Sequence, residues 1–427
     1  MGKLKNICLV ALVFLLSSCE GLDPDKDKVA PENVMIFISE GFNNLSSYLL
    51  QDIQDMKKGY IPQKNDKNVL LILGHHLKRG YDVMTSPNLV RLYMDNEVMV
   101  CDTIMTLPEG SRLTTKQNLK AFLSFIQDEF PVENYGLVLS SHATGWLPAG
   151  YYSNPAIYEK KAGGTAGVMR AGYSSIFAHT YPETDPSLPI TKTIMAEKIG
   201  SDMSEEMEIE DFADAIPMHL NYILFDACLM GCVEVAYALR NVADYIGFSQ
   251  AEVMSEGFDY VNLASRLLSD QPDPRSVCED YIALYESFTG SYRSATISLV
   301  RTENLPALAS VCKGLFEKYR EQIAALEPDN VQCFGGTKRY FYDLYDILSK
   351  AGAEQKDLAA LDAAFNDCIA YKGTTGQYYS ASDSSTHEIY SFCGLTTYLS
   401  PAGTAFLNTF YQSLDWNKDT NYITISK

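Results

Sequence analysis

The sequence lacks the short motifs by which common cofactor sites are recognised. It contains no Cys-x-x-Cys pair, no P-loop and no Gly-x-Gly-x-x-Gly turn, and its ten cysteines are scattered along the chain. Basic residues are also scarce, with 34 against 54 acidic residues and a net charge of −20. Since phosphate binding requires a basic face, this balance argues against nucleic acid as a partner. No cofactor is predicted.

Metal motifs are also missing. The adjacent His75 and His76 have no carboxylate at a ligand-like spacing, and two basic residues follow after one intervening leucine, so we interpret them as a loop or strand-end pair. The chain contains no EF-hand loop, and acidic clusters alone are weak support for calcium. We predict no resident metal and leave calcium open, without a motif to support it.

The chain has no apolar run of the roughly 20 residues that a membrane-spanning helix needs. Residues 7–16 are almost entirely apolar and follow two lysines, which is typical of a signal peptide. Residues 16–19 (Leu-Ser-Ser-Cys) resemble a bacterial lipobox. That resemblance implies cleavage after residue 18 and attachment of lipid to the thiol of Cys19. The alternative is an ordinary secretory signal that happens to end in a cysteine.

An acidic segment follows the leader. Residues 19–32 are rich in Asp, Lys and Pro, and this composition predicts a solvated tether. The early acids Glu20, Asp23 and Asp25 resemble the export signal of surface lipoproteins in the Bacteroidetes. We therefore expect a lipid anchor in the bacterial outer membrane, with display on the cell surface left open.

The length of 427 residues exceeds the roughly 250–300 at which single cores usually divide. Apolar strand-like runs alternate with helical stretches up to about residue 265, which predicts a mainly parallel α/β sheet covered on both faces. The expected strands are 34–39, 69–73, 98–104, 135–140, 222–225 and 245–249, and the expected helices are 42–58, 115–129 (capped by Thr114), 209–216 and 228–240.

Beyond residue 265 helical patterns dominate. The expected helices there are 275–289, 304–325, 340–350 and 355–371, and the expected strands are 295–300 and 394–400. We therefore predict two units, a catalytic domain over residues 33–265 and a mixed α+β C-terminal domain over residues 266–427.

Two chemically suggestive segments begin where predicted strands end. His142 follows the strand 135–140, and Cys228 follows the strand 222–225. Active groups of parallel α/β sheets gather at the carboxyl ends of strands. A thiol at the start of a helix is favoured as thiolate, a nearby histidine can take its proton, and backbone N–H groups can bind an oxyanion. These parts suit a cysteine peptidase, although a lone cysteine after an apolar strand is more often part of the core.

The two segments together resemble the clostripain family of cysteine peptidases, in the caspase-like clan. Residues 226–231 (Asp-Ala-Cys-Leu-Met-Gly) match that family's second motif in full. The first motif matches at His142, Gly145 and Trp146, but Ala143 stands where the family has glycine. Further similarities occur in the family's order at residues 43–45, 342–345, 394–395 and 414–416. The resemblance implies a caspase-like α/β/α sandwich.

The resemblance also implies roles for individual residues. Cys228 would be the nucleophile and His142 the general base, and the backbone N–H groups of Ala143 and Cys228 would form the oxyanion hole. Alanine at position 143 keeps that N–H but loses the freedom of glycine to adopt positive φ. If the position needs positive φ, alanine would cost on the order of 1 kcal/mol and could displace the donor.

Substrate recognition is implied at Asp226, which matches an acid that binds a basic side chain at P1. The family's second acid would lie in the following loop, where both Glu252 and Glu256 are candidates. Asp226 could instead cap a helix starting at Cys228. The long interval before Cys228 is also where relatives are often activated by self-cleavage after a basic residue, which makes Lys161 and Arg170 candidates.

Three functions are compatible with this pattern. The first is a cysteine endopeptidase that cleaves proteins or peptides after Arg or Lys through a thioester acyl-enzyme. The second is a catalytically silent binding lipoprotein on the same fold, and the third binds glycans or a partner through the C-terminal domain. Cys232 lies one helical turn after Cys228 and is either a second reactive thiol or, more simply, a buried structural one.

Overall fold

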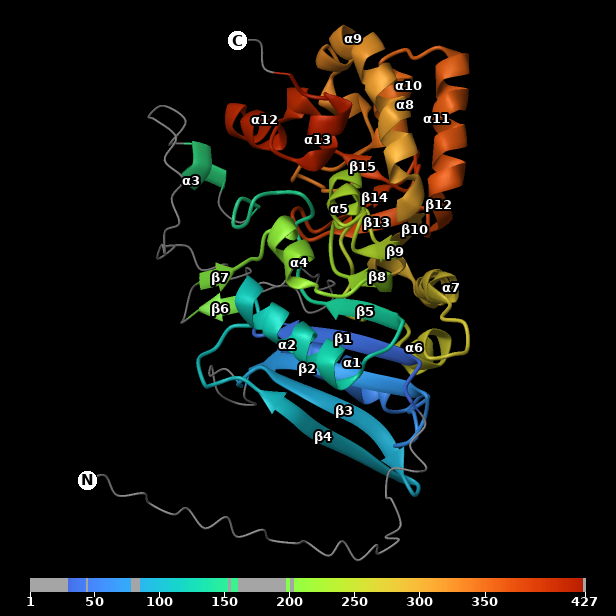
Figure 1. Ribbon diagram of the computed structural model, residues 1–427. Coiled ribbons are helices and arrows are strands. Elements are labelled where there is room, and N and C mark those ends of the chain that lie inside the picture. The colour runs from blue at the N-terminus through green and yellow to red at the C-terminus, as the bar shows by residue number, and fades with distance from the viewer. Residues whose placement is uncertain are drawn as a thin grey trace, which may run out of the picture.

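The computed structural model describes residues 30–43, 45–77, 85–152, 155–159, 197–199 and 203–424. Figure 1 shows a central sheet with helices packed around it and several C-terminal helices gathered beyond one edge of the sheet. Cys19, Lys161 and Arg170 lie outside the described residues. Lipid attachment and processing therefore stay predictions.

Nine strands form the central sheet. Their spatial order is β12 (Ile369–Thr374), β10 (Thr296–Arg301), β9 (Ala243–Phe248), β8 (Leu220–Asp226), β5 (Asn134–Ser140), β1 (Asn33–Gly41), β2 (Asn68–His76), β3 (Asn88–Asp95) and β4 (Val98–Thr106). The strands from β9 to β2 in this order pair parallel to one another. At one edge β10 and β12, and at the other edge β3 and β4, each pair antiparallel with the neighbouring strand nearer the centre. Every residue of β1 and β2 is buried, as expected for strands covered on both faces. The predicted α/β class is confirmed.

Helices cover both faces of this sheet. One face carries α1 (Ser46–Met56), α6 (Tyr260–Leu267) and α7 (Pro274–Glu286), and α6 packs against both of the others. The opposite face carries α2 (Lys116–Glu129), α4 (Ile209–Ala215) and α5 (Val233–Ala238). The helices divide between the two faces because crossovers between parallel strands are right-handed. From β1 to β2 the chain advances toward one edge of the sheet, and from β5 to β9 it advances toward the other edge, so the connecting helices lie on opposite faces. In the described part of the chain, no helix is both long and apolar enough to cross a membrane.

The predicted helix over residues 115–129 shows how closely pattern and structure agree. Its apolar residues, spaced to share one face, are buried in α2 as Leu119, Phe122, Leu123 and Ile126. Thr115, rather than the predicted Thr114, forms the N-cap, because its Oγ1 accepts a hydrogen bond from the N–H of Asn118 at 3.3 Å.

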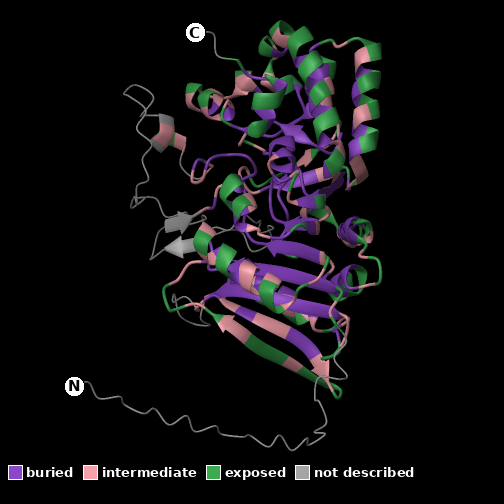
Figure 2. Ribbon diagram, in the orientation of Figure 1, coloured by how far each residue is buried: buried purple, intermediate pink, exposed green. Residues whose placement is uncertain are grey.

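The C-terminal part extends the same sheet. β10 and β12 lie beyond residue 265, yet β10 pairs with β9 and β12 pairs with β10. One hydrophobic core runs through both halves of the chain. Figure 2 shows this core as buried ribbon continuous from the central strands into the C-terminal helices. The boundary predicted at residue 265 stays a prediction. The pairing means that any C-terminal unit shares the sheet with the catalytic one.

The remaining elements are short or peripheral. The further helices are α3 (Pro155–Glu159), α8 (Leu305–Lys318), α9 (Arg320–Ala324), α10 (Leu344–Lys350), α11 (Gln355–Cys368), α12 (Ala405–Tyr411) and α13 (Asp415–Thr420). The two-stranded sheets are β6 (Glu197–Ile199) with β7 (Met203–Glu205), β11 (Tyr342–Asp343) with β15 (Thr396–Thr397), and β13 (Gln377–Ser380) with β14 (Ser385–Glu388). The strand predicted over 394–400 is thus reduced to β15.

One predicted helix is wrong at the point that matters most for function. The helix expected from Cys228 begins only at Val233. Residues 227–232, here called the cysteine turn, form backbone hydrogen bonds to another segment instead: the N–H of Leu229 donates to the carbonyl of Ala251 at 3.0 Å, and the N–H of Gly231 donates to that of Ser249 at 2.7 Å. Leu229 also has a φ of 60°, which a right-handed helix excludes.

Candidate active site

The two candidate catalytic residues lie at one edge of the sheet. β5 and β8 are parallel neighbours, and Ser140 pairs with Asp226 in their register. His142 and Cys228 each follow these paired residues by two positions, just past the ends of β5 and β8. Both are almost completely buried, with exposed fractions of 5% for His142 and 3% for Cys228. The two candidate residues therefore follow the ends of two adjacent parallel strands.

The environment of the sulfur differs from the one expected at a helix start. The N–H of Val253 donates to Sγ of Cys228 at 3.3 Å, and Sγ lies 3.7 Å from the carbonyl oxygen of the same residue. Since the helix begins five positions later, its dipole is not aimed at the thiol. A backbone N–H that donates to sulfur stabilises negative charge there, so Val253 supplies the kind of support that the sequence assigned to the helix.

Ala143 does not need the freedom of glycine. Five non-glycine residues of the described chain have positive φ, and Ala143 is not one of them. The left-handed position falls instead on Gly145, with a φ of 61°. A Cβ on Gly145 would lie 2.6 Å from the carbonyl oxygen of Leu229 and equally close to the ring of Phe341. Gly145 therefore allows the segment after His142 to pack directly on the cysteine turn.

Two carboxylates that the sequence interpretation missed hold the segment after His142. Residues 141–152, here called the histidine loop, contact Glu206 and Glu208. Thr144 Oγ1 and the N–H of Gly150 donate to Oε2 of Glu206 at 3.2 and 3.1 Å, and the N–H of Ala149 donates to Oε1 of Glu208 at 3.0 Å. In the sequence, both residues lie in an acidic stretch just before the helix predicted over residues 209–216, and the sequence pattern assigns no role to them.

These carboxylates are not ordinary surface acids. Both are half-buried. Burial raises the pKa of Glu206, and burial together with the nearby charge of Glu210 raises the pKa of Glu208 to about 7. Accepting backbone and hydroxyl hydrogen bonds opposes these shifts without cancelling them. The attachment of the histidine loop therefore includes a group that titrates near neutral pH.

Asp226 is buried two positions before Cys228, at the end of β8. Its Oδ2 accepts hydrogen bonds from Ser140 Oγ, at 2.8 Å, and from the hydroxyl of Tyr260. Gly257 packs directly against the carboxylate, in a backbone conformation with a φ of 62°. The alternative role as a helix cap is wrong, because α5 has Cys232 at its N-cap position. Asp226 is instead a buried carboxylate that accepts hydrogen bonds from two hydroxyl groups.

The two candidates for a second acid differ. Glu252 is buried, and its Oε1 accepts hydrogen bonds from Ser380 Oγ at 2.7 Å and from the N–H of Ala381 at 3.1 Å, so it holds the end of β13. Glu256 is exposed, and its charge contributes to raising the pKa values of Tyr281 and Tyr285. Glu256 is therefore the better placed of the two to meet a substrate beside Asp226.

The other cysteine of this region is structural in character. Cys232 is fully buried, and its backbone forms an isolated parallel β-bridge with that of Thr396. Burial raises the pKa of its thiol well above the usual range, and hydrogen bonding from the backbone of Trp146 only partly opposes that. A thiol that stays protonated inside the core is a poor nucleophile.

The histidine pair is not grouped for metal binding. Nδ1 of His75 lies 3.1 Å from Oε2 of Glu40, and both side chains are fully buried. Burial, followed by the neighbouring His75, lowers the pKa of His76 to about 4. Among the described residues no three His, Cys, Asp or Glu side chains are grouped to hold a metal ion.

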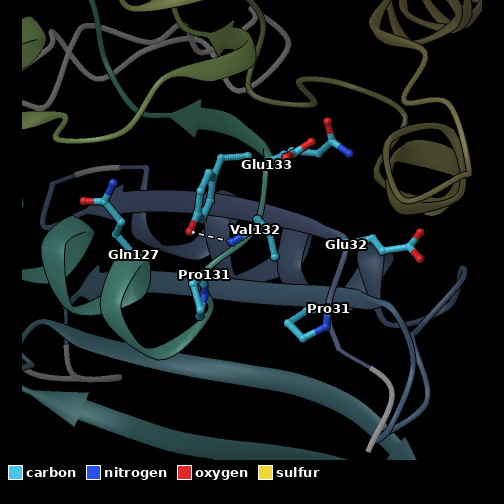
Figure 3. Close-up of a pocket in the computed structure, with 8 residues that line it drawn as sticks. Pro31, Glu32, Gln127, Pro131, Val132 and Glu133 are labelled. Carbon is cyan, nitrogen blue, oxygen red and sulfur yellow. Dashed lines mark hydrogen bonds between the residues drawn. The ribbon is translucent and has the colours of Figure 1, made fainter.

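An open pocket of about 610 Å³ lies at the opposite end of the strands (Figure 3). Glu32 precedes β1 there, and Asn134 begins β5, so the pocket lies at the amino ends of the strands whose carboxyl ends carry the site. None of the residues that line it belongs to the candidate site. The two features are therefore separate.

Comparison with known proteins agrees with this geometry. A model described as the clostripain family matches residues 37–165 and 190–419. Clostripain of Hathewaya histolytica is 23% identical over 249 residues, which are 55% of this chain. The match spans only 41% of that relative's own length.

Solved structures resemble the chain over most of its length. An inactive zymogen C11 protease from Parabacteroides distasonis superposes with a TM-score of 0.71 at 26% identity, covering 92% of this chain and 98% of the other. A secreted C11 cysteine protease from Bacteroides thetaiotaomicron, solved with an irreversible peptide inhibitor, gives 0.72 at 21% identity and 92% and 100% coverage, which supports the fold. The expected caspase-like fold is confirmed, and the chain belongs to the clostripain family of cysteine peptidases.

Proposed function

We propose that the protein is a cysteine endopeptidase in which Cys228 attacks the peptide bond and His142 acts as the base. The observation that carries the proposal is the pairing of Ser140 with Asp226, which sets His142 and Cys228 on adjacent parallel strand ends. The donation from the N–H of Val253 to the sulfur supports the same role for Cys228. Active peptidases of this kind need a thiol and an imidazole within reach of one carbonyl.

The chemistry follows from these positions. His142 removes the thiol proton, and the sulfur of Cys228 attacks the carbonyl carbon to give a tetrahedral oxyanion. The backbone N–H groups of Ala143 and Cys228 are proposed to bind that oxyanion. His142 then protonates the leaving amine, which leaves a thioester on Cys228. A water molecule, deprotonated by His142, hydrolyses the thioester and regenerates the thiol.

The proposed specificity is for Arg or Lys at P1. A buried carboxylate close to the nucleophile suits a cationic side chain, because an ion pair formed there gains from the low dielectric once both groups are desolvated. Asp226 meets this description, and exposed Glu256 adds negative charge at the same side. The Parabacteroides protein described as an inactive zymogen also supports activation by cleavage, for which Lys161 and Arg170 remain our candidates.

Peptide hydrolysis tests the proposal. The full-length chain, purified in detergent, is assayed on fluorogenic peptides with Arg, Lys, Ala or Asp at P1, beside Cys228→Ala and His142→Ala. We expect cleavage after Arg and Lys that both substitutions abolish. Cleavage after another residue would keep the mechanism and remove the specificity. No cleavage, together with no labelling of Cys228 by an alkylating peptide, would favour a silent binding protein.

The lipid anchor is proposed from the sequence alone, with Cys19 as the acylated residue and the bacterial outer membrane as the location. Metabolic labelling with a palmitate analogue tests it directly. We expect the label on the wild-type chain and none on Cys19→Ser. A labelled Cys19→Ser protein would contradict the anchor.

A further inference from the structure

Three buried tyrosines lie on α6 and α7, and one of them contacts the end of β8. The hydroxyl of Tyr260, at the start of α6, donates to Asp226, and its ring packs on Phe37 of β1 at 5.4 Å between centroids. Tyr281 and Tyr285, one turn apart on α7, pack with tilted rings whose centroids are 4.7 Å apart. We call Tyr260, Tyr281 and Tyr285 the tyrosine cluster.

Two hydroxyls of the tyrosine cluster have no visible partner. The side chains of Tyr281 and Tyr285 are 1% and 0% exposed, and neither hydroxyl makes a hydrogen bond to any described residue. Buried hydroxyls are nearly always paired, because an unpaired one forfeits its hydrogen bonds to water. Phenylalanine would fill the same space without that loss. The chain nevertheless keeps polar groups at both positions, which points to a role in binding.

The charges around these hydroxyls are acidic. Burial raises the pKa of Tyr281 well above the ordinary range, and the nearby negative charge of Asp226 raises it further. Burial likewise raises the pKa of Tyr285, and Glu256, Asp226 and Asp52 add to it. Both tyrosines therefore keep their protons at neutral pH and offer neutral oxygen acceptors. Acceptor oxygens surrounded by carboxylates fit a cation.

Resting on the proposed function, we infer that Tyr281 and Tyr285 determine specificity by binding the cationic end of a P1 lysine or arginine. An ammonium has three N–H groups to satisfy and a guanidinium has five. Asp226 already accepts from Ser140 and Tyr260 at one oxygen, so one carboxylate cannot pair every N–H of the substrate. The hydroxyls of Tyr281 and Tyr285 supply further acceptors and obtain in return the partners that they lack.

Single Tyr→Phe substitutions test this inference, because they remove one oxygen and keep the ring. In Tyr281→Phe and Tyr285→Phe, we expect the ratio of kcat/KM for Lys or Arg at P1 to that for Ala at P1 to fall about tenfold. Loss of a hydrogen bond to a charged group is of that size or larger. The fall should appear in KM, because the contact is made with substrate and transition state alike. The Tm should stay level or rise, since an unpaired buried hydroxyl disappears.

A matched control separates binding from structure. The hydroxyl of Tyr422, in the C-terminal segment and outside the tyrosine cluster, is also buried but donates to the carbonyl of Tyr398 at 2.9 Å. Tyr422→Phe should lower the Tm and leave the P1 ratio unchanged. If Tyr281→Phe and Tyr285→Phe behave in the same way, their hydroxyls are structural groups bound to ordered water, and the inference is wrong.

A binding measurement keeps the inference independent of turnover. Agmatine, which carries a free guanidinium, is titrated into full-length Cys228→Ala protein by calorimetry, with and without Tyr281→Phe. We expect binding that the second substitution weakens about tenfold. If Cys228→Ala binds agmatine but the wild-type chain hydrolyses no peptide, the proposed function is refuted and the cation site is retained. Hydrolysis after Lys or Arg with an unchanged P1 ratio in both tyrosine variants would refute the cation site alone.

Discussion

The histidine loop and the cysteine turn meet at one edge of the sheet, but different chemistry holds each of them. Backbone pairs fix the cysteine turn, because Leu229 and Gly231 donate to carbonyls of residues 249–251 and Thr396 donates to the carbonyl of Gly231. The histidine loop depends on the carboxylates of Glu206 and Glu208. Backbone pairs thus hold the segment that carries Cys228, and side-chain carboxylates hold the segment that carries His142.

This difference decides how each half of the site responds to its surroundings. Backbone amides do not titrate in the physiological range, so the geometry of the cysteine turn is insensitive to pH. Glu208 titrates near pH 7 and contacts the histidine loop. Any pH dependence of activity beyond that of His142 and Cys228 themselves should therefore arise from the histidine loop and its contact with Glu208. The contact at which the two segments meet should be the most sensitive point of all.

That contact is at Gly145, and Gly145→Ala should have the largest effect of any substitution outside Cys228 and His142. The new Cβ would lie 2.6 Å from the carbonyl oxygen of Leu229, and the left-handed backbone adds a further penalty. The histidine loop must move away from the cysteine turn. Since a displacement of about 1 Å can lower a rate about 100-fold, we expect kcat/KM to fall by about that factor. Peptide hydrolysis with circular dichroism as a folding check measures it.

Ala143→Gly is the matched control two positions away. Ala143 has no positive φ, so the glycine typical of the family brings no relief of strain here. We expect kcat/KM to stay within about twofold of wild type. A large gain in activity would mean that alanine does displace the oxyanion donor, and the comparison between the two positions would then be reversed.

The next largest effect should come from Glu206, which accepts two hydrogen bonds from the histidine loop. Glu206→Ala leaves Thr144 Oγ1 and the N–H of Gly150 unpaired, so kcat/KM should fall about tenfold. Glu206→Gln keeps an acceptor oxygen and should recover most of the activity. Equal losses in the two variants would show that the charge, rather than the hydrogen bonds, positions the loop.

Much of this site could be predicted from the sequence. The apolar strands ending at Ser140 and Asp226 are continuous and local, so their type and direction follow from composition, and the motifs then place His142 and Cys228 at their ends. The environment of the sulfur could not be predicted. It depends on Leu229 and Gly231 pairing with residues 249–251, a contact between segments that no local pattern encodes.

The same reason explains the other omissions. Edge strands β10 and β12 join the sheet by antiparallel pairing between segments far apart in sequence. Glu252 and Glu256 lie four residues apart in one loop and look equivalent in the sequence. Only the packing of β13 against that loop buries Glu252 and leaves Glu256 exposed. Whether a loop side chain is buried depends on its tertiary contacts, which cannot be predicted from the local sequence.

Glu208 should give the site's stability a distinct pH dependence. Its pKa is raised from 4.5 in the unfolded chain to about 7 in the folded one, so the folded state binds the proton more tightly. The stabilisation is complete below pH 4.5 and is lost as pH rises to about 7. Glu208→Gln removes this term, on the order of 1–3 kcal/mol for a half-buried group.

Thermal unfolding from pH 4 to 8 checks this prediction. The Tm of wild type relative to Glu208→Gln should decline across the window from about 4.5 to 7 and then level off. Glu234→Gln in α5, just after the cysteine turn, provides no matched contrast, because Glu234 is buried among hydroxyls. Parallel curves for wild type and Glu208→Gln would remove Glu208 as the source of any pH response.

The smallest effect should come from Cys232, the second thiol of the cysteine turn. It is fully buried and stays protonated, and the turn around it is held by backbone pairs that its side chain does not make. Cys232→Ala should therefore cost about 1 kcal/mol of stability, as small core truncations do, and leave kcat/KM within about twofold. Cys228→Ala, only four positions earlier, should abolish hydrolysis. If Cys232→Ala also lost most activity with its Tm intact, the cysteine turn would depend on side chains after all, and its contrast with the histidine loop would fail.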